Sequence, residues 1–486
     1  MITYQDYEEQ VLNGRITLEE FVQNCINKHT GSEEYNIALD ADKYDAQQNS
    51  TIMRYVKKIY SATGRESVDP YASNTKLCSN FFHRLNTQKC AYLLGNGVSF
   101  VDHKKEVVDS TNGTKKIIDE TKEKLGKRFD SNLKKVAYFS LIHGVSFGFW
   151  DYDTLRLFKI TEFVPLWDEE TSNLRAGIRF WQIDADKPIM AVFYEVDGFT
   201  KLKRDKKKDS VFEIIQEKTP YKSTIIASKE GGVEEMRFSN YEGFPIVPLY
   251  GSDLKQSTLV GMKAKIDAFD LINSGFADDI QDCAEIFWIV SGGSGMSDKE
   301  LSKFRKRLKL NKVVDVESRD GSATPYTQDI PTTARETFLA RIENQIYKDF
   351  AAFNPEHIEA GNITATQINA AYQPMDEEAD DFEFHLIDFV QSILELMGID
   401  DTPVFKRNKI SNQKEQTDMV LSCADYLDTE TLLSKLPFIT NDEVSEIMAK
   451  KDAEMEQRME EQQSMMESMQ NTGDNDDEDV DDGEEE

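Results

Sequence analysis

The chain has 486 residues and a formal net charge of −32, from 57 Lys and Arg against 89 Asp and Glu. That length allows two or more domains with a sizeable core. The acidic balance excludes a protein that wraps nucleic acid by neutralising its phosphates, since that mode needs clustered cations. No apolar run approaches the roughly 20 residues needed to cross a bilayer, and residues 1–20 lack the pattern of a secretory signal.

The five cysteines are scattered and never occur in CxxC spacing. We therefore expect free, mostly buried thiols in a reducing cytoplasm. No Cys or His pair has zinc-ligand spacing, and no cofactor is expected.

The first half of the chain predicts helices followed by strands. Short helical patterns such as Thr17–Ile26 come first. Two longer helices are expected over residues 74–94, stopped by Gly95-Asn96-Gly97, and over residues 121–143, ended by Gly144. The apolar residues then alternate with a period of two, and strands rich in β-branched and aromatic residues are expected to continue to Gly251. Within them, "KLKRDKKKD" at 201–209 is expected to form an exposed hairpin tip.

The second half is mainly helical. An apolar stripe from Met262 to Ile280 predicts one long helix, and a stripe from Phe338 to Phe350 predicts another. Between them lies a compact insert: a strand in "IFWIV", a loop, a helix capped by Ser297, a strand in "KVVDVE", and "SRDGSATPYTQDIP" as an outgoing loop. A further helix should reach Met397 with an interruption near Pro374. An extended segment at 402–416, two helical patterns (429–436 and 441–470) and an acidic tail follow.

Motifs for chemistry are weak. "LLGNGVSF" at 93–100 lacks the third glycine of a dinucleotide loop and fits a helix stop leading into a strand, and "SGGSG" at 291–295 lacks the Lys of a P-loop. Asp278, Asp279 and Asp282 suit a polar helix face better than a metal site. The six histidines are isolated from any Ser or Cys at motif spacing, so no catalytic triad is indicated.

A basic cluster and a loop remain as candidate functional segments. The cluster sits on the helix of the insert, where it is either a solvated helix face or a docking surface for an acidic partner; it comprises Lys303, Arg305, Lys306, Arg307, Lys309 and Lys312. The loop lies between two long helices and begins where Asn354-Pro355 breaks the helical pattern. It offers too little for an active site; its polar residues are Asn354, Glu356, His357, Glu359 and Asn362.

The order of these segments resembles the portal proteins of tailed bacteriophages, in particular the siphophage type of Gram-positive hosts. Several stretches carry the resemblance: "NTKLCSNFFHRLNTQKCAYLLGNGVSF", "KIDAFDLINSGFADDIQD", "DIPTTARETFLARIENQIYKDF", "AGNITATQINAAYQPM" and "LDTETLLSKLPFITNDEVSEI". Each is degenerate alone, and their order over about residues 74–450 is the specific feature. The first 70 residues match only loosely.

The resemblance implies an α+β, mainly helical portal fold with a β-rich wing, long stem helices, a small α/β clip and a helical crown. Laid onto this chain, the wing covers 1–255 and a wing helix 364–400, with stem helices at 256–283 and 331–350. The clip is 284–330, the tunnel loop 351–363, the crown 401–465 and the acidic disordered tail 466–486.

The resemblance also implies a function without catalysis. Copies of the chain, usually twelve, would form a ring at one capsid vertex, and double-stranded DNA would pass through its channel during packaging and ejection. The tunnel-loop residues would line the constriction, and the basic clip residues would help to dock the terminase large subunit or a head–tail adaptor. Major capsid and scaffold proteins would be further partners. The expected location is the virion, with the host cytoplasm during assembly and no membrane.

Two rival interpretations stay open at this point. One is another virion part, although an adaptor would be much shorter and a scaffold would lack the β-rich half. The other is a hydrolase assembled from distant residues; a nuclease of this kind would require a metal ion held by clustered carboxylates.

Overall fold

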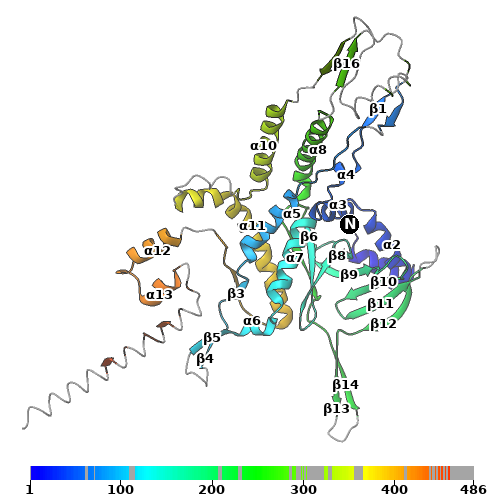
Figure 1. Cartoon of the computed structure of the whole chain (residues 1–486). Helices are drawn as coiled ribbons and strands as arrows, with labels where there is room; N and C mark the ends of the chain where they lie inside the picture. Colours follow the sequence, from blue (N-terminus) through cyan, green and yellow to red (C-terminus); the bar gives the residue numbers. More distant parts are fainter. Residues whose placement is uncertain are drawn as a thin grey trace, which may run out of the picture.

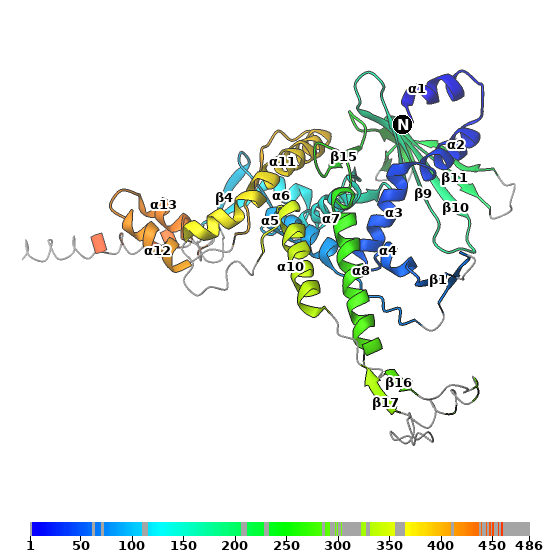
Figure 2. The same cartoon turned by 90° about the horizontal axis from the view of Figure 1, so that it is seen from above.

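The computed structural model describes residues 2–60, 64–69, 72–108, 115–205, 211–227, 233–283, 287–291, 322–326, 331–354, 365–409 and 413–436, with scattered positions at 297–303 and 439–459. The protein is a mixed α and β structure in which a broad body carries a long projection and a smaller helical lobe (Figures 1 and 2). No helix within these residues is long and apolar enough to cross a membrane.

The N-terminal part is helical up to a pair of short strands. A helical pattern was expected from Thr17, and Thr17 caps α2 in a capping box with Glu20. The elements are α1 (Tyr4–Tyr7), the short π-helix η1 (Glu8–Leu12), α2 (Leu18–Thr30), α3 (Glu33–Asp45), α4 (Ser50–Arg54), β1 (Lys58–Tyr60) and β2 (Glu66–Val68).

The next helices correct two expectations. The helix expected from residue 74 begins only at Phe81, and residues 74–79 are not helical. The helix expected over 121–143 is two helices, because Gly126 between them adopts a φ of +82°. The elements are α5 (Phe81–Leu94), β3 (Val98–Phe100), β4 (Lys104–Val108), β5 (Lys115–Asp119), α6 (Glu120–Leu125) and α7 (Phe129–His143).

The strand-rich region forms two main antiparallel sheets, with strand orders β12-β11-β10-β9-β8 and β15-β6-β7. Of residues 201–209, expected to form a hairpin tip, 201–204 instead lie inside β11 and pair with β10, and 206–209 lie outside the described residues. The strands are β6 (Val145–Trp150), β7 (Leu155–Lys159), β8 (Phe163–Trp167), β9 (Leu174–Trp181), β10 (Ile189–Glu195), β11 (Gly198–Arg204), β12 (Glu213–Thr219), β13 (Lys222–Ala227), β14 (Val233–Ser239) and β15 (Ile246–Tyr250).

The second half contains the long helices that the apolar stripes predict. Residues 322–326, expected as loop, form β17, which pairs with β16; α12 begins inside the segment expected to be extended. Pro374 lies within a continuous α11 rather than interrupting it. The elements are α8 (Leu259–Cys283), β16 (Phe287–Ser291), β17 (Ser322–Tyr326), α10 (Thr332–Asp349), α11 (Ala365–Met397), β18 (Pro403–Phe405), α12 (Gln413–Ser422) and α13 (Thr429–Ser434).

The largest hydrophobic core joins α5, α7 and α11, so the second half of the chain is packed onto the first. Phe389 of α11 approaches Gly148 of β6 so closely that a β-carbon there would meet its ring at 2.4 Å. A further core at the base of the projection unites α5, α8 and α10. The projection is therefore anchored in the body by apolar packing.

Candidate functional site

The predicted site residues divide into two that the structure describes and others that lie outside the described residues. Lys303 is helical and exposed. Asn354 is only 6% exposed, so its side chain does not face solvent in the subunit. Outside the described residues lie Glu356, His357, Glu359 and Asn362 of the loop, and Arg305, Lys306, Arg307, Lys309 and Lys312 of the basic cluster.

The helix that leads to the loop, α10, forms an antiparallel pair with α8. α8 and α10 lie side by side in both views (Figures 1 and 2). Lys265 near the start of α8 pairs with Asp349 at the end of α10, and Arg335 near the start of α10 pairs with Asp279 near the end of α8. The hydrogen bond from Lys265 holds the pKa of Asp349 below its usual value. An ion pair toward each end therefore fixes the register of the two helices.

An aromatic stack holds the base of the loop. Phe353, near the start of the loop, stacks on Tyr372 of α11 with ring centroids 4.3 Å apart and an interplanar angle of 9°. Tyr372 in turn stacks on Tyr92 of α5, at 5.7 Å and 14°. Stacked aromatic pairs add about 0.5–1.5 kcal/mol beyond the area they bury. The two flanks of the loop are thus joined to each other and to α5.

Polar contacts from α5 reinforce this stack of Phe353, Tyr372 and Tyr92, which we call the loop frame. Gln88 Nε2 donates to the backbone oxygen of Phe353 at 2.9 Å. Lys89 Nζ lies 2.6 Å from a carboxylate oxygen of Glu378 and 4.8 Å from the centroid of the Phe350 ring. One turn of α5 therefore contacts both the segment at the end of α10 and the first half of α11.

A cluster of charges ties the segment after β18 to α11. Three carboxylates, spaced four and three residues apart on α11, surround Arg407: Asp376 at 3.1 Å, Glu383 at 3.0 Å, and Asp380. Lys409 Nζ lies 2.6 Å from Asp376. The helical lobe of α12 and α13 is thereby attached close to the loop frame.

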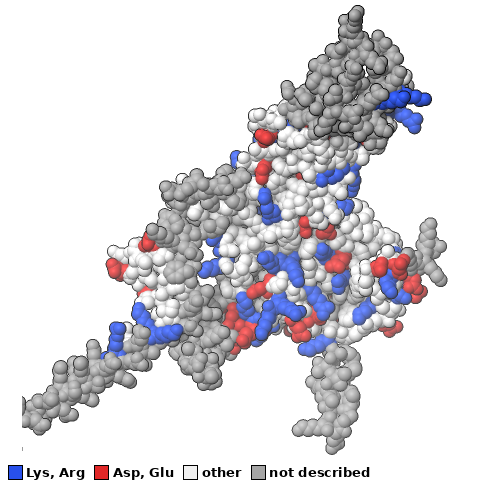
Figure 3. Space-filling view, in the orientation of Figure 1, with Lys and Arg blue, Asp and Glu red and all other residues white. Residues whose placement is uncertain are grey.

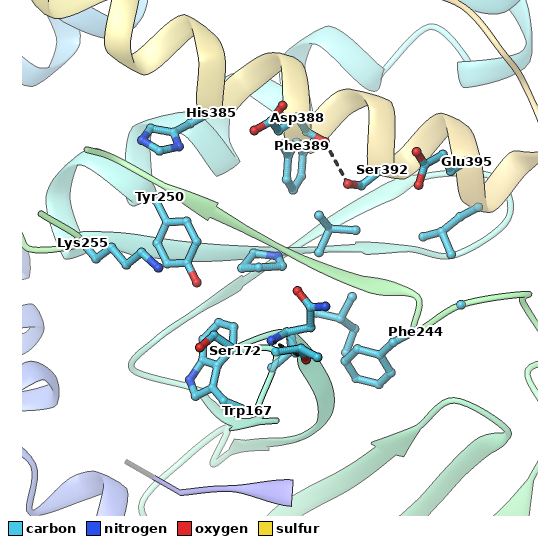
Figure 4. Close-up of a pocket in the computed structure, with 18 of the residues that line it drawn as sticks. Trp167, Ser172, Phe244, Tyr250, Lys255, His385, Asp388, Phe389, Ser392 and Glu395 are labelled. Atoms are coloured by element: carbon cyan, nitrogen blue, oxygen red, sulfur yellow. Dashed lines mark hydrogen bonds between the residues drawn. The ribbon is translucent and has the colours of Figure 1, made fainter. Parts of the chain in front are cut away.

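A surface recess of about 730 Å³ lies on the other side of α11. His385, Asp388, Ser392 and Glu395 of α11 lie opposite Tyr250, Lys255 and Trp167, as Figure 4 shows. Ser392 Oγ donates to the backbone oxygen of Asp388 at 2.8 Å, and the His385 imidazole lies 3.0 Å from Asp253. These contacts give no nucleophile paired with a base. Across the described ranges, no group of three His, Cys, Asp or Glu side chains is arranged to hold a metal ion.

Sequence reasoning missed the stack and the charge cluster. Tyr92 and Tyr372 both lie in stretches that carry the family resemblance, but nothing in either stretch shows that their rings meet. Asp376, Asp380 and Glu383 could have been noticed as one acidic helix face.

Comparison with known proteins gives a consistent result over most of the chain. A family model described as "Phage portal protein, SPP1 Gp6-like" matches residues 36–467. The portal protein of Bacillus phage SPP1 is 23% identical over 467 residues, which cover 90% of this chain and 87% of that protein. The portal protein of Clostridium phage phiCD119 is 26% identical over 215 residues, 42% of this chain; that match spans about half of the relative (48%).

Among solved structures, a chain from the neck of an empty GTA particle superposes with a TM-score of 0.41 and 8% sequence identity. The superposition covers 73% of this chain and 88% of that chain.

Proposed function

Because this chain belongs to the SPP1 Gp6-like family of phage portal proteins, we propose that its copies form a closed ring at one vertex of a capsid, through which double-stranded DNA is packaged and ejected. The observation that carries the proposal is the family match over residues 36–467. A supporting feature is the antiparallel pair of α8 and α10, in which α10 leads to a loop whose first residues are held by the Phe353–Tyr372 stack. A ring needs such a loop only for its shape and polarity, so catalytic side chains are not required.

We assign the parts of the chain as follows. Residues 1–255 and 364–400 form the wing, α8 and α10 the stem, residues 284–330 the clip, and residues 401–465 the crown. The β16–β17 ribbon lies beyond the end of α8, where a clip would be (Figure 1). The acidic tail from 466 has too few apolar residues to form a core.

The loop would form the constriction of the channel, with Glu356, His357, Glu359 and Asn362 toward the DNA. We leave Asn354 out of this lining because it is only 6% exposed. A ring of subunits at −32 each repels phosphates from all sides. Screening over roughly 8 Å at physiological salt keeps that repulsion local. DNA would therefore meet no deep electrostatic minimum on its way through.

The clip and the wing would hold the partners. Lys303, Arg305, Lys306, Arg307 and Lys309 would attract an acidic surface of the terminase large subunit or of a head–tail adaptor. The wing would contact the major capsid and scaffold proteins. The ring would assemble in the host cytoplasm and remain in the virion.

Electron microscopy of the purified full-length chain tests this function directly. We expect rings with a central hole, and native mass spectrometry should give a single closed oligomer, most simply a dodecamer. Only monomers or solid particles, at every protein and salt concentration tried, would refute the proposal.

A further inference from the structure

An extended arm leaves the body from residue 53 at the end of α4, runs beside α8 and returns to α5; the structure describes its residues 53–60, 64–69 and 72–80 (Figures 1 and 2). Its two strands, β1 and β2, pair with each other and with no other strand in the part of the chain that the structure describes. A two-stranded ribbon alone is marginally stable in water. Something outside the ribbon must therefore hold the arm in place.

The returning half of the arm is fixed to α8 by a ladder of hydrogen bonds. The backbone N–H groups of Thr75, Leu77 and Ser79 donate to Asp278 Oδ1 (2.7 Å), Ser274 Oγ (3.0 Å) and Asp270 Oδ1 (2.9 Å). Four helical residues rise about 6 Å and two extended residues span about 6.7 Å, so the two spacings match.

The outgoing half of the arm joins the same ladder. Lys57 Nζ lies 2.9 Å from the second oxygen of Asp278, whose side chain is buried. Asp270 is fully buried and also accepts from Asn49, just before α4. Polar contacts thus hold the arm in a fixed position on the side that faces α8.

The arm leaves large apolar side chains in water. Met53, Tyr55, Val56, Val68 and Leu77 are 53%, 41%, 41%, 59% and 38% exposed. Leu271 and Ile280 of α8 are also exposed. Exposed apolar surface on a rigid support marks an interaction site when it is contiguous rather than scattered.

Charge identifies the partner. From 54 to 76 the arm holds five cations (Arg54, Lys57, Lys58, Arg65, Lys76) and two anions (Glu66, Asp69), and Lys57 is paired with Asp278 of α8; 5 − 2 − 1 therefore leaves +2, whereas the whole chain is −32. Basic side chains gather at its β1 end in Figure 3. A second copy of this acidic chain is complementary in charge, and a subunit in a ring presents two different faces to its neighbours.

We propose that the arm is a clasp that binds the adjacent copy of this chain, with its apolar side chains buried against that copy. The inference rests on the proposed ring, because it needs a neighbour that is always present.

Photo-crosslinking identifies what the arm touches. A benzoyl-phenylalanine placed at Val56 of the full-length chain should give covalent dimers of the chain on irradiation, while the same group at the exposed Ile183, in the β9–β10 turn, should give far fewer. Dimers from position 56 at the level of position 183, or crosslinks to DNA or a capsid protein in place of a second copy, would overturn the clasp.

Assembly measurements give the energetic test. Val56→Ser with Val68→Ser should raise the subunit concentration at half-assembly by roughly tenfold. Ile183→Ser is the matched control and should leave it unchanged. Ser274→Ala removes the hydrogen bond from the Leu77 N–H to α8. It should therefore also raise the subunit concentration at half-assembly, and it should increase hydrogen exchange at the Leu77 amide.

The outcomes separate the two proposals. Wild-type assembly in both the double variant and Ser274→Ala would refute the clasp and leave the ring intact. A wild-type chain that never forms rings would refute both. If the double variant fails to fold, the crosslink from position 56 decides.

Discussion

At the residue scale, two glycines differ in what a β-carbon would meet. Gly144 ends α7 with a φ of +87°, and a β-carbon there would lie 2.5 Å from the backbone carbon of Gln256. Gly261, in the first turn of α8, has nothing within 4 Å of that position. The first glycine is required by the fold, whereas the second is replaceable.

We therefore expect opposite effects of the same substitution. Gly144→Ala should lower the free energy of unfolding by about 3 kcal/mol, through backbone strain and the clash. Gly261→Ala should raise it by up to about 1 kcal/mol, since alanine favours the helix. Urea unfolding followed by circular dichroism measures both, and equal effects would contradict this interpretation.

The ionisation of Asp376 should make the stability of the fold depend on pH. Burial alone would raise its pKa, but hydrogen bonds from Lys409, Tyr92 and Arg407 outweigh burial and hold the pKa below 3.8. Because the folded-state pKa is lower than the unfolded one, the ionised carboxylate stabilises the fold above pH 3.8. That contribution is lost as pH falls below 3.8 through the folded-state pKa.

Asp376→Asn should consequently destabilise the protein by a constant amount from pH 7 to 5, and by less below pH 4. Thermal unfolding over a pH series measures the difference from wild type. Asp184→Asn in the β9–β10 turn is the control and should show no such trend. A difference for Asp376→Asn that stays constant to pH 3 would show that these hydrogen bonds do not stabilise the ionised form.

At the element scale, the sequence predicted long periodic helices better than segments that depend on distant partners. The apolar stripes located α8 and α10, and period-two patterns located β6 and β9. Residues 74–80 were predicted as helix because Leu77, Phe81 and Leu85 fit its spacing. The ladder on α8 takes the N–H groups of that segment instead, and no local pattern reveals a distant partner.

In the candidate site, too, local patterns were predictable from the sequence and contacts between distant segments were not. The break at Asn354-Pro355 was predictable because proline disfavours helix in the preceding residue. The stack of Phe353, Tyr372 and Tyr92 was not, since it joins three elements far apart in the chain. β17 was missed for a similar reason: "SATPY" lacks strand periodicity and is held by pairing with β16.

The tie between residues 406–409 and α11 should control the mobility of the helical lobe. Arg407→Leu removes a cation shared by three carboxylates and leaves them to repel one another. Proteolytic cleavage between residues 410 and 436 should then become several-fold faster. Lys406→Leu removes an equal charge at an exposed neighbouring position and should have little effect. Equal cleavage rates in both variants would rule out the tie.

The basic cluster of the clip should act on partners and not on assembly. Replacing Arg305, Lys306 and Arg307 with Ser should leave rings intact, weaken binding of the terminase large subunit or adaptor, and flatten the dependence of affinity on salt. The matched control replaces three exposed lysines of the body, Lys124, Lys127 and Lys135. Unchanged affinity in the clip variant would eliminate this docking surface.

At the scale of the whole molecule, net charge and function are linked. In the proposed ring, with each subunit at −32, DNA would pass only if its attraction to the protein were weak everywhere along the channel. Each contact between a cation and a phosphate releases counterions and gains free energy, most at low salt. Added cations at the constriction should therefore slow the DNA.

Glu356→Lys combined with Glu359→Lys makes this change in the proposed channel lining. The variant should form rings as the wild type does, because it leaves the stack of Phe353, Tyr372 and Tyr92 unchanged. Packaging into reconstituted procapsids should slow or stall, more at low salt than at high. Glu242→Lys with Glu395→Lys, in the recess on the other side of α11, makes the same charge change and should package normally. Packaged DNA length over a salt series is the measurement, and wild-type rates at every salt concentration would show that the loop does not meet the DNA.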